Sequence, residues 1–536
     1  MTDVTNRYEL LTSPLLLVRN AERERRELTL PGVLAALVRG EVRDFPALRP
    51  HQRHAWHAFL VQLGAIALHQ ASNAEPSEDE EGWKRLLLTL TVGSEEPWSL
   101  IVPDLSRPAF LQPPVPEGNL KRLKDVFESP EQFDILVTSK NHDVKACRMR
   151  APTPEHWVFG LVSLQTMQGF SGRQSYGIAR MNSGYGNRPG VSFASDEGVD
   201  LGSRFRRDLA ILLEVRDELV KEFGYCNRSG HALLWLEPWD GNSSLSLAQC
   251  DPYFIEICRR VRLTADDNRM VARYVSTKVA RLDAASAKGN TGDPWTPVDK
   301  KEGKALSVSA RGFDYRLTQE LLLSSDWRPG FTQKIVTGDD KGSGKLAFVA
   351  AALARGQGKT EGLHERVLPI PARVKRWLAK PDEQERIATL AERRVVEVDE
   401  FQRKVLRPAL CYLFQAGPRP QDLDLRDERP RPFIAKLNAD VDALFFERLW
   451  EDIGVDGHEA QKRWADVLCK LGERILNAAI EIAPLPVARR YRAIAVATSV
   501  FHGAKRKLYP ELFDPDLREN DDATSGEAAN DQGATV

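Results

Sequence analysis

The sequence predicts an α+β protein, with a large mixed N-terminal domain containing irregular Gly-rich loops, followed by a C-terminal four-helix bundle. Three observations predict it. Short apolar, β-like runs alternate with Gly- and Pro-rich loops from Leu87 to Trp327. At 376–400 the sequence becomes charged and strongly helical in composition. Beyond that point, apolar residues recur three and four positions apart, which is the spacing of amphipathic helices.

The first helices are expected close to the N-terminus. Residues 8–18 form a strand-like apolar stretch. Thr29 can cap a short helix that has Pro31 near its start. A longer helix is predicted from Gln52 to His69, because its aromatic and aliphatic residues lie three and four apart. The acidic loop at 75–81 ends it as solvated surface.

The middle of the chain is predicted to be mainly short strands. Examples are 98–102 and 232–236, with a helix at 204–223 between them. Residues 334–362 hold many glycines and lysines and are interpreted as a loop or hairpin leading to a helix at 346–353.

Four helices are then predicted, at about 398–415, 433–453, 457–483 and 485–507. We therefore expect a mixed α/β domain at 1–385, the bundle at 390–508 and a disordered acidic tail at 511–536. After Pro510 there are eight acidic residues and one arginine, so the tail carries a charge of −7. Because the net charge of the whole chain is −1, residues 1–510 carry +6.

Composition limits the class of protein. The chain has 536 residues and no run of about 18 apolar residues, and residues 1–20 lack the features of a secretory signal, so we expect a cytoplasmic protein with no membrane partner. Six widely spaced cysteines, never in C-x-x-C, exclude a disulfide scaffold and disfavour a zinc ribbon. No metal or other cofactor is expected.

Two incomplete motifs leave an enzyme as an alternative function. Gly358-Lys359-Thr360 ends like a P-loop, but Leu353 stands where the pattern requires glycine, so an ATPase is poorly supported. His142-Asp143 is the dipeptide of metal-dependent phosphohydrolases, and His51, His54 and His57 lie upstream. A helix bearing Arg49, Gln52 and Arg53 explains these three as a polar face, so a phosphohydrolase is also poorly supported. A purely structural scaffold is a third alternative.

The segment richest in potential binding residues is 139–189, with seven lysines and arginines against two acids. Its glycines allow close approach of a ligand to the backbone, while Arg, Asn, Gln and Tyr supply donors and stacking faces. This composition suits a nucleic-acid backbone or minor groove, and it suits an ordinary surface loop equally well. A second Gly- and Lys-rich segment, 338–366, has little net charge and fits a surface hairpin. The last helix has a basic face, which fits solvent exposure or phosphate contact.

The order of several segments resembles the CasA family, the large subunits of the type I-E CRISPR surveillance complex Cascade. The resemblance spans nearly the whole chain except the acidic tail, and no single motif in it is diagnostic. The stretches that carry it are Leu-Leu-x-x-Pro-Leu-Leu-Leu-Val-Arg ending at Arg19, Leu48-Arg-Pro-His-Gln-Arg53, Arg107-Pro-Ala-Phe-Leu-Gln112, Thr138-Ser-Lys-Asn-His-Asp143, the 165–189 block, Gly356-Gln-Gly358 and the C-terminal helices.

The resemblance implies a function without catalysis. Family members join a guide-RNA ribonucleoprotein, recognise the protospacer-adjacent motif (PAM) in duplex DNA, and start strand separation. They then help to hold the displaced strand and dock the CRISPR helicase–nuclease. The partners that the resemblance implies for this chain are therefore guide RNA, the other Cascade subunits, target double-stranded DNA and the CRISPR helicase–nuclease. Sequence beyond the PAM is read by the guide.

The resemblance also implies roles for particular segments. The 138–145 loop is similar to the family loop at the PAM and crRNA backbone, and the 169–172 turn to its minor-groove glycine loop. Gln357 matches a glutamine at the tip of a strand-separating wedge. The residues implied at the PAM and its DNA are Lys140, Asn141, His142, Lys145, Gly169, Phe170, Ser171, Gly172, Arg173, Asn182, Asn187, Arg188, Arg355, Gly356, Gln357, Gly358 and Lys359. Those implied on the displaced strand are Arg489, Arg490, Arg492, Lys505 and Lys507.

One departure from the family bears on PAM reading. Some members have a Cys-rich, metal-like turn with a PAM-contacting lysine, whereas the stretch near Cys250 has no cysteine cluster and no adjacent lysine. The sequence therefore gives no PAM preference. The second glycine cluster, 182–188, is an alternative minor-groove loop.

Overall fold

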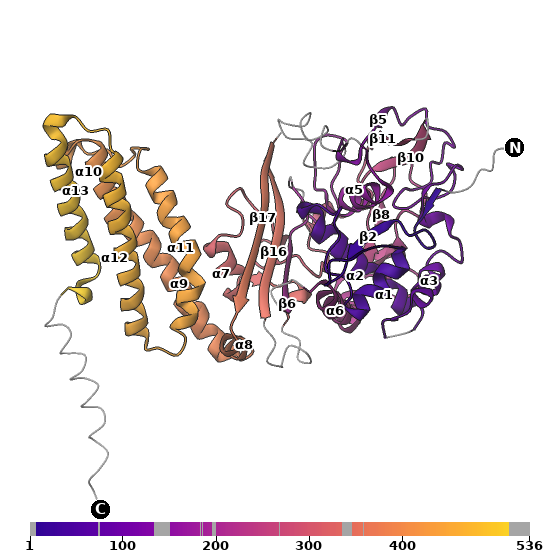
Figure 1. Ribbon diagram of the computed structural model, residues 1–536, viewed down its shortest axis with the longest axis horizontal. Coiled ribbons are helices and arrows are strands. Elements are labelled where there is room, and N and C mark those ends of the chain that lie inside the picture. Colours follow the sequence, from indigo (N-terminus) through magenta and orange to yellow (C-terminus); the bar gives the residue numbers. More distant parts are fainter. Residues whose placement is uncertain are drawn as a thin grey trace, which may run out of the picture. The chain divides into compact units, whose positions relative to one another are not determined.

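The computed structural model describes residues 7–72, 75–132, 149, 151–182, 184, 186–195, 200–266, 269–334, 346–356 and 359–513. The chain divides into two compact units. The first comprises Met1–Phe313 and Glu320–Lys375, and the second comprises Asp314–Gln319 and Arg376–Val536. Figure 1 shows helices mixed with short strands in the first unit and long helices in the second. The predicted α+β class with a helical C-terminal region is confirmed.

Helix α2 is the centre of the first unit's core. It is buried from His54 to Leu68, as expected of a helix that is largely apolar all round. It packs against α3, α5, α6 and β9. The capping prediction is also confirmed, since the Thr29 side chain accepts a hydrogen bond from the Gly32 N–H at the start of α1. These helices are α1 (Leu30–Arg39), α2 (Arg53–Gln70), α3 (Glu80–Thr89), α5 (Pro154–Met167) and α6 (Leu201–Phe223).

The strands of the first unit are short and form several small sheets. Their bounds are β1 (Arg7–Glu9), β2 (Leu16–Arg19), β3 (Arg25–Leu28), β4 (Ser99–Ile101), β5 (Asp125–Phe127), β6 (Gly190–Ser195), β7 (His231–Leu233), β8 (Leu245–Ser246), β9 (Cys250–Ile255), β10 (Arg260–Asp266), β11 (Arg269–Val275), β12 (Leu282–Asp283), β13 (Val298–Asp299), β14 (Lys304–Ala305), β15 (Trp327–Arg328), β16 (Leu346–Gly356) and β17 (Lys359–Ile370).

The helix predicted at 346–353 is wrong. This segment is the first part of β16, the central strand of an antiparallel sheet in the order β17-β16-β6. The run Leu346-Ala-Phe-Val-Ala-Ala-Ala-Leu353 has good helix propensity. Hydrogen bonding to a strand on each side outweighs that propensity, and Figure 1 shows β16 and β17 as the long arrows of this sheet.

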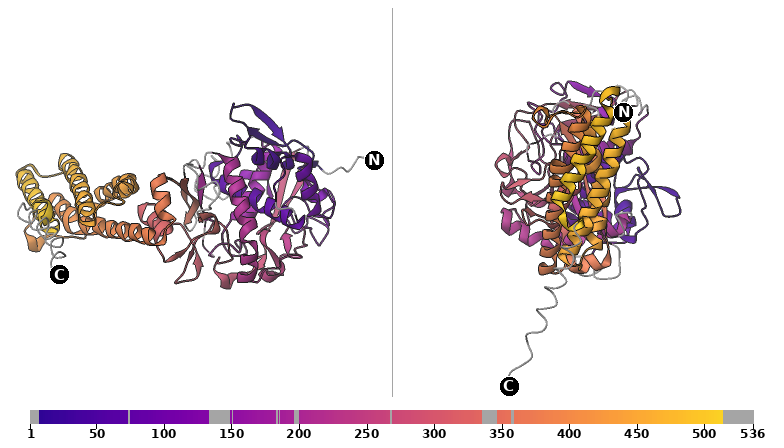
Figure 2. Two further views of the ribbon diagram at one scale, coloured as in Figure 1. Left: turned by 90° about the horizontal axis from the view of Figure 1, so that it is seen from below. Right: turned by 90° about the vertical axis from the view of Figure 1, so that its left-hand side faces the viewer.

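The second unit holds long helices that run side by side (Figure 2). Three predicted helices are found close to their expected bounds, but the first begins at Pro381 rather than near 398 and continues through a π-helical turn, Gln402–Leu406. The helices from Tyr315 onward are α7 (Tyr315–Leu323), α8 (Ala372–Leu378), α9 (Pro381–Phe401), α10 (Arg407–Phe414), α11 (Arg431–Glu451), α12 (Gly457–Ile482) and α13 (Val487–Leu508).

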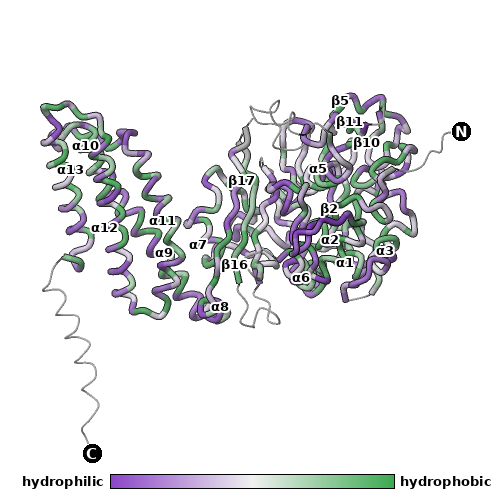
Figure 3. Tube along the Cα trace, in the orientation of Figure 1, coloured by the Kyte–Doolittle hydropathy of each residue, from purple (hydrophilic) through white to green (hydrophobic). Residues whose placement is uncertain are grey.

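The bundle core is aromatic and closely packed. Hydrophobic and hydrophilic residues alternate along its helices (Figure 3), which gives each helix one buried face. Phe445 meets Trp464 edge to face at a centroid distance of 5.8 Å. A Cβ atom on Gly472 would lie 2.5 Å from the ring of Phe401, so glycine is required for this approach.

Candidate nucleic-acid interface

A glycine loop, residues 168–177, follows α5 and leads into a return segment, 178–190, that ends at the start of β6. The loop begins where α5 ends, and an isolated β-bridge joins Gln168 to Asn187 across its base. Gly169 donates its N–H to the Gly186 carbonyl at 2.9 Å, and Phe170 donates to the Gly184 carbonyl at 3.2 Å. The two glycine clusters of the sequence are therefore the two sides of one structure.

Most glycines at the base of this loop serve its own packing. A Cβ on Gly169 would lie 2.3 Å from the Gly184 carbonyl oxygen, and one on Gly177 would lie 2.5 Å from the Gly169 carbonyl carbon. Gly169 is also buried. Its lack of a side chain is thus explained by neighbouring backbone, and not by the close approach of a ligand expected from the sequence.

The tip of the loop, 171–175, is the part that faces solvent. Two backbone hydrogen bonds of 3.0 Å close it, from Ser171 N–H to the Ser175 carbonyl and from Ser175 N–H to the Gly172 carbonyl. Gly172 has φ +137° and open space where a Cβ would stand. Arg173 is exposed. The tip therefore presents bare backbone and one cation, a combination that suits a phosphate backbone or minor groove.

Arg259 holds the tip in place. This buried arginine donates from Nη1 to the Tyr176 carbonyl and from Nη2 to Gln168 Oε1 at 3.2 Å. Nη2 also donates to Ser171 Oγ at 3.0 Å. Sequence reasoning missed this positioning residue, because Arg259 lies 83 positions or more from the groups it orders.

A second anchor comes from the end of β11. Thr277 donates its N–H to the Gln174 carbonyl at 3.1 Å, and the Tyr176 hydroxyl donates to the Lys278 carbonyl at 2.8 Å. Lys278 is exposed. The loop tip therefore lies beside a second cation, Lys278, which the sequence analysis did not include.

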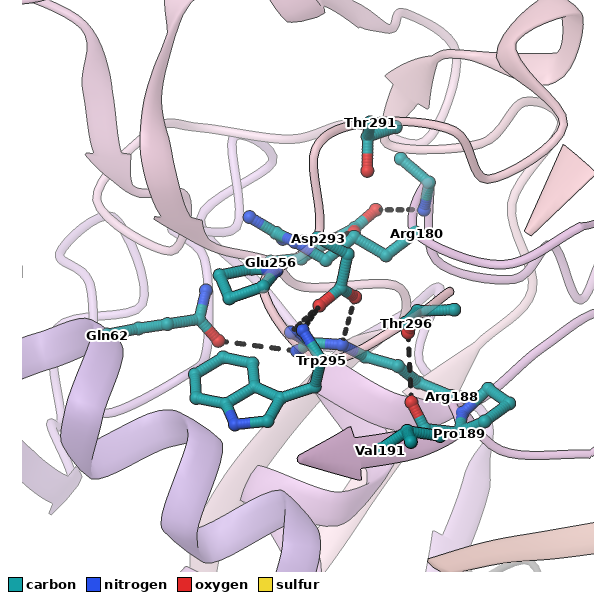
Figure 4. A network of polar contacts seen from close by, with 12 residues as sticks. Gln62, Arg180, Arg188, Pro189, Val191, Glu256, Thr291, Asp293, Trp295 and Thr296 are labelled. Atoms are coloured by element: carbon teal, nitrogen blue, oxygen red, sulfur yellow. Dashed lines mark hydrogen bonds and ion pairs between the residues drawn. The ribbon is translucent and has the colours of Figure 1, made fainter. Parts of the chain in front are cut away.

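The return segment differs because its arginines are buried. Arg188, expected at the DNA, is 1% exposed and forms an ion pair with Asp293, with Nη2 to Oδ1 at 2.6 Å (Figure 4). Its Nη1 donates to Gln62 Oε1 at 3.3 Å. Asn187 is buried as well. Neither side chain is available to a DNA backbone in this structure, so both are left out of the interface.

Arg180 completes this buried network. Its guanidinium lies 3.9 Å from a carboxylate oxygen of Glu256 (Figure 4). It also lies 3.6 Å from the ring centroid of Phe254. Glu256 Oε1 also accepts the Ala179 N–H at 2.8 Å. Burial raises the pKa of Glu256 to about 7 and lowers the pKa of Arg180. Arg180 and Arg188, two of the seven cations that suggested a phosphate contact, are thus used inside the fold.

Several residues predicted at the DNA lie outside the part of the chain that the structure describes, and for others only the backbone is described. Lys140, Asn141, His142 and Lys145 are outside it, as are Gln357 and Gly358. Arg355 and Gly356 end β16 and Lys359 begins β17, with Gly356 paired to Lys359. Asn182 is half-buried beside the loop base.

The basic face of α13 is partly exposed. Arg489, Arg490 and Arg492 are exposed near its start and Lys507 near its end. Lys505 is buried, forms an ion pair with Glu473, and lies over the rings of Phe501 and Phe513 at 5.7 and 5.0 Å. It therefore belongs to the bundle interior and not to the predicted strand-binding face.

The described parts of the two enzyme motifs do not form the sites that those motifs require. A P-loop needs a helix after Gly-Lys-Thr, but Lys359 and Thr360 begin strand β17. His51, His54 and His57, expected on a polar face, are buried. Among the described residues, no cluster of His, Cys, Asp and Glu could hold a metal ion, and no helix is long and apolar enough to cross a membrane.

Comparison with solved structures identifies the architecture. Thermus thermophilus CasA (Cse1) is similar with a TM-score of 0.63 at 14% identity, over 94% of this chain and 100% of that one. The chain has the CasA fold. Cse1 from Acidimicrobium ferrooxidans (TM-score 0.62, 14% identity, 96% and 100% coverage) and from Thermobifida fusca (0.63, 15%, 94% and 98%) share it. No protein-family model matches the sequence, and no curated protein does. The CasA fold accounts for both units of the chain.

Proposed function

We propose that the chain is the large subunit of a crRNA-guided Cascade complex that recognises the PAM in double-stranded DNA. The observation that carries this proposal is the CasA fold along 94–96% of the chain. In this function the chain promotes strand separation and R-loop formation, and it docks the CRISPR helicase–nuclease. It works with guide RNA and the other Cascade subunits in the cytoplasm and is not itself an enzyme.

The loop tip 171–175 is the proposed DNA contact within the described residues. Arg173 and Lys278 would pair with phosphates, while the bare backbone at Gly172 would enter the minor groove. The 138–145 loop and Gln357 remain proposed partners in PAM contact and strand opening, and Arg489, Arg490, Arg492 and Lys507 remain proposed contacts of the displaced strand.

The test is target binding by the guide-loaded complex, with and without this chain, across randomised flanking bases. Addition of the chain should impose a flanking-base preference. Arg173→Gln should weaken binding and lower the slope of log K against log[salt] by about one, because one phosphate contact is lost. Arg311→Gln is the control, since Arg311 is an exposed arginine of the same unit outside the proposed interface.

Two results would contradict the proposal. In the first, binding and flanking-base preference are the same without the chain, which would favour a scaffold. In the second, Arg173→Gln and Arg311→Gln have equal effects, which would remove the loop tip from the interface while leaving the subunit assignment standing.

A further inference from the structure

Helix α13 differs from the other long helices of the second unit in its charges. It has no acidic residue, and its six cations are Arg489, Arg490, Arg492, Lys505, Arg506 and Lys507. Lys505 is buried and pairs with Glu473, whereas the other five are exposed. Within the described ranges, none of these five forms an ion pair or a side-chain hydrogen bond.

The neighbouring helices pair exposed cations with acids of their own. On α12, Lys470 Nζ lies 2.6 Å from Asp466 Oδ2, and on α11, Arg448 Nη1 lies 2.7 Å from Glu451 Oε2. The partners are three or four positions apart, which makes them neighbours on one helix face. Because α13 has no acid, its exposed cations have no counter-ion of this kind.

The exposed face of α13 has small side chains between two cationic ends. Ala488, Arg492, Ala495, Ser499 and Arg506 are all exposed and follow the spacing of one helix face. Only alanine, serine and similarly small residues of this face lie between the two arginines. An extended chain can therefore lie close to the helix and contact cations at both ends.

The start of α13 favours anions for a second reason. Its first turn has no acidic residue, and Pro486 at the N-cap provides no side-chain hydrogen bond. The N-terminal end of a helix carries partial positive charge, to which Arg489 and Arg490 add. Val487 and Tyr491 are 88% and 87% exposed, so the described part of the chain leaves this end uncovered.

The acids that match these cations follow α13 in the sequence. Segment 514–536 contains seven acidic residues and one arginine, a charge of −6. It continues from Phe513, whose ring lies 5.0 Å from the Lys505 ammonium near the end of α13. The 22 residues of α13 span about 33 Å. A chain of 23 residues spans up to about 75 Å when extended, so the segment reaches Arg489 at the far end of the helix.

We propose that segment 514–536 binds along the exposed face of α13, where its carboxylates pair with Arg489, Arg490, Arg492, Arg506 and Lys507. Because both belong to one chain, the acids are present at an effective concentration on the order of millimolar. A free polyanion, such as a single DNA strand, then binds this face only by displacing the segment. The contact does not depend on the proposed function, whereas this shielding role rests on the displaced-strand contact proposed above.

Carbodiimide coupling of the full chain tests the contact. The reagent joins a lysine amine to a carboxylate where the two touch, and Arg492→Lys places an amine on the face without changing its charge. Mass spectrometry of the digested chain should find position 492 coupled to acids of 514–536. The coupling should fall about fivefold or more in 1 M NaCl, where the Debye length is about 3 Å.

Arg403→Lys is the matched control. Arg403 is an exposed arginine of the same unit, with Nη2 3.8 Å from Glu400 Oε1, so this variant should couple to Glu400 and not to 514–536. A mixture of isotope-labelled and unlabelled chains shows whether coupling joins two copies. The proposal is overturned if position 492 couples to 514–536 no more than position 403 does, or if the coupled peptides come only from two different copies.

Methyl NMR of alanine-labelled chain gives a second readout. Ala488 and Ala495 are exposed on the face, and Ala435 is an exposed alanine of α11. Replacing the seven acids of 514–536 by their amides should shift the methyl signals of Ala488 and Ala495 and leave that of Ala435 in place. Unchanged signals from Ala488 and Ala495 would overturn the contact.

Binding of a thymidine strand of about 20 nucleotides tests the shielding role. At about 0.1 M salt, the amide variant should bind this strand about tenfold more tightly than the wild type, because no acids have to be displaced. Equal affinities, or no binding by either protein, would overturn the shielding role and leave the contact standing.

Discussion

The glycine loop and the return segment belong to one continuous stretch and have similar compositions, but they differ in whether their arginines are exposed. The loop tip, 171–175, faces solvent with Arg173 exposed, whereas the return segment, 178–190, buries Arg180 and Arg188. The difference lies in acids supplied from elsewhere in the chain, namely Glu256 and Asp293. A basic, Gly-rich stretch is thus a binding surface only where the fold provides no internal counter-ion.

The largest effect on stability is expected from Asp293→Asn, which removes the counter-ion of the return segment's Arg188. This change leaves Arg188 buried without its counter-ion, so the free energy of unfolding should fall by about 3–5 kcal/mol. Urea denaturation measures it. Asp326→Asn, at an exposed aspartate, should change it by less than about 0.5 kcal/mol. A loss below about 1 kcal/mol for Asp293→Asn would show that burial of Arg188 is not what fixes the return segment.

A pH-dependent effect is expected from Glu256. Its pKa is raised to about 7 in the folded chain, above the ordinary glutamate value of 4.5, so between these values the folded state binds more protons than the unfolded state. Its contribution to stability therefore falls as pH rises from about 4.5 to 7 and is level above that range. At about 1.4 kcal/mol per pKa unit, the full effect is at most about 3 kcal/mol.

Glu256→Gln isolates this contribution, because the amide can still accept the Ala179 N–H. The variant should gain stability relative to the wild type as pH rises from 5 to 7, measured by urea denaturation at each pH. A difference between the two proteins that stays constant with pH would contradict the assignment. Arg173→Gln, at the loop tip, should show no such dependence on pH.

The smallest effect on stability is expected at the anchor of the tip. Arg259→Met removes the hydrogen bonds to Tyr176, Gln168 and Ser171, which together stabilise the closed loop by about 1–2 kcal/mol. Amide exchange of the tip should accelerate roughly 5–30-fold. Arg173→Met, an exposed arginine in the same loop, is the matched control and should leave exchange unchanged. Equal exchange in both variants would mean that the β11 anchor alone holds the tip.

Much of the helical structure could be predicted from the sequence, because periodic apolar positions and capping residues are local properties. Helix α2 and the last three bundle helices lie close to their expected bounds. The segment 346–353 could not be assigned this way, because its Leu- and Ala-rich run fits a helix and becomes a strand only when β6 and β17 pair with it.

The candidate site could be predicted only in outline. The exposed tip, with Gly172 and Arg173, lies within the segment that composition had singled out. Gly169 and Arg188 belong to the same segment and are buried. Nothing in the local sequence distinguishes these two pairs of residues.

The sequence by itself determined the fold class, the helices of the bundle and the stretch that holds the glycine loop. Only the tertiary structure decided which arginines face solvent, that Arg259 orders the tip, and that Lys505 is buried while the other cations of α13 are exposed. The physical reason is the range of the interactions. Helix periodicity and capping act over a few residues, whereas ion pairing and burial join groups a hundred or more positions apart, such as Arg188 and Asp293.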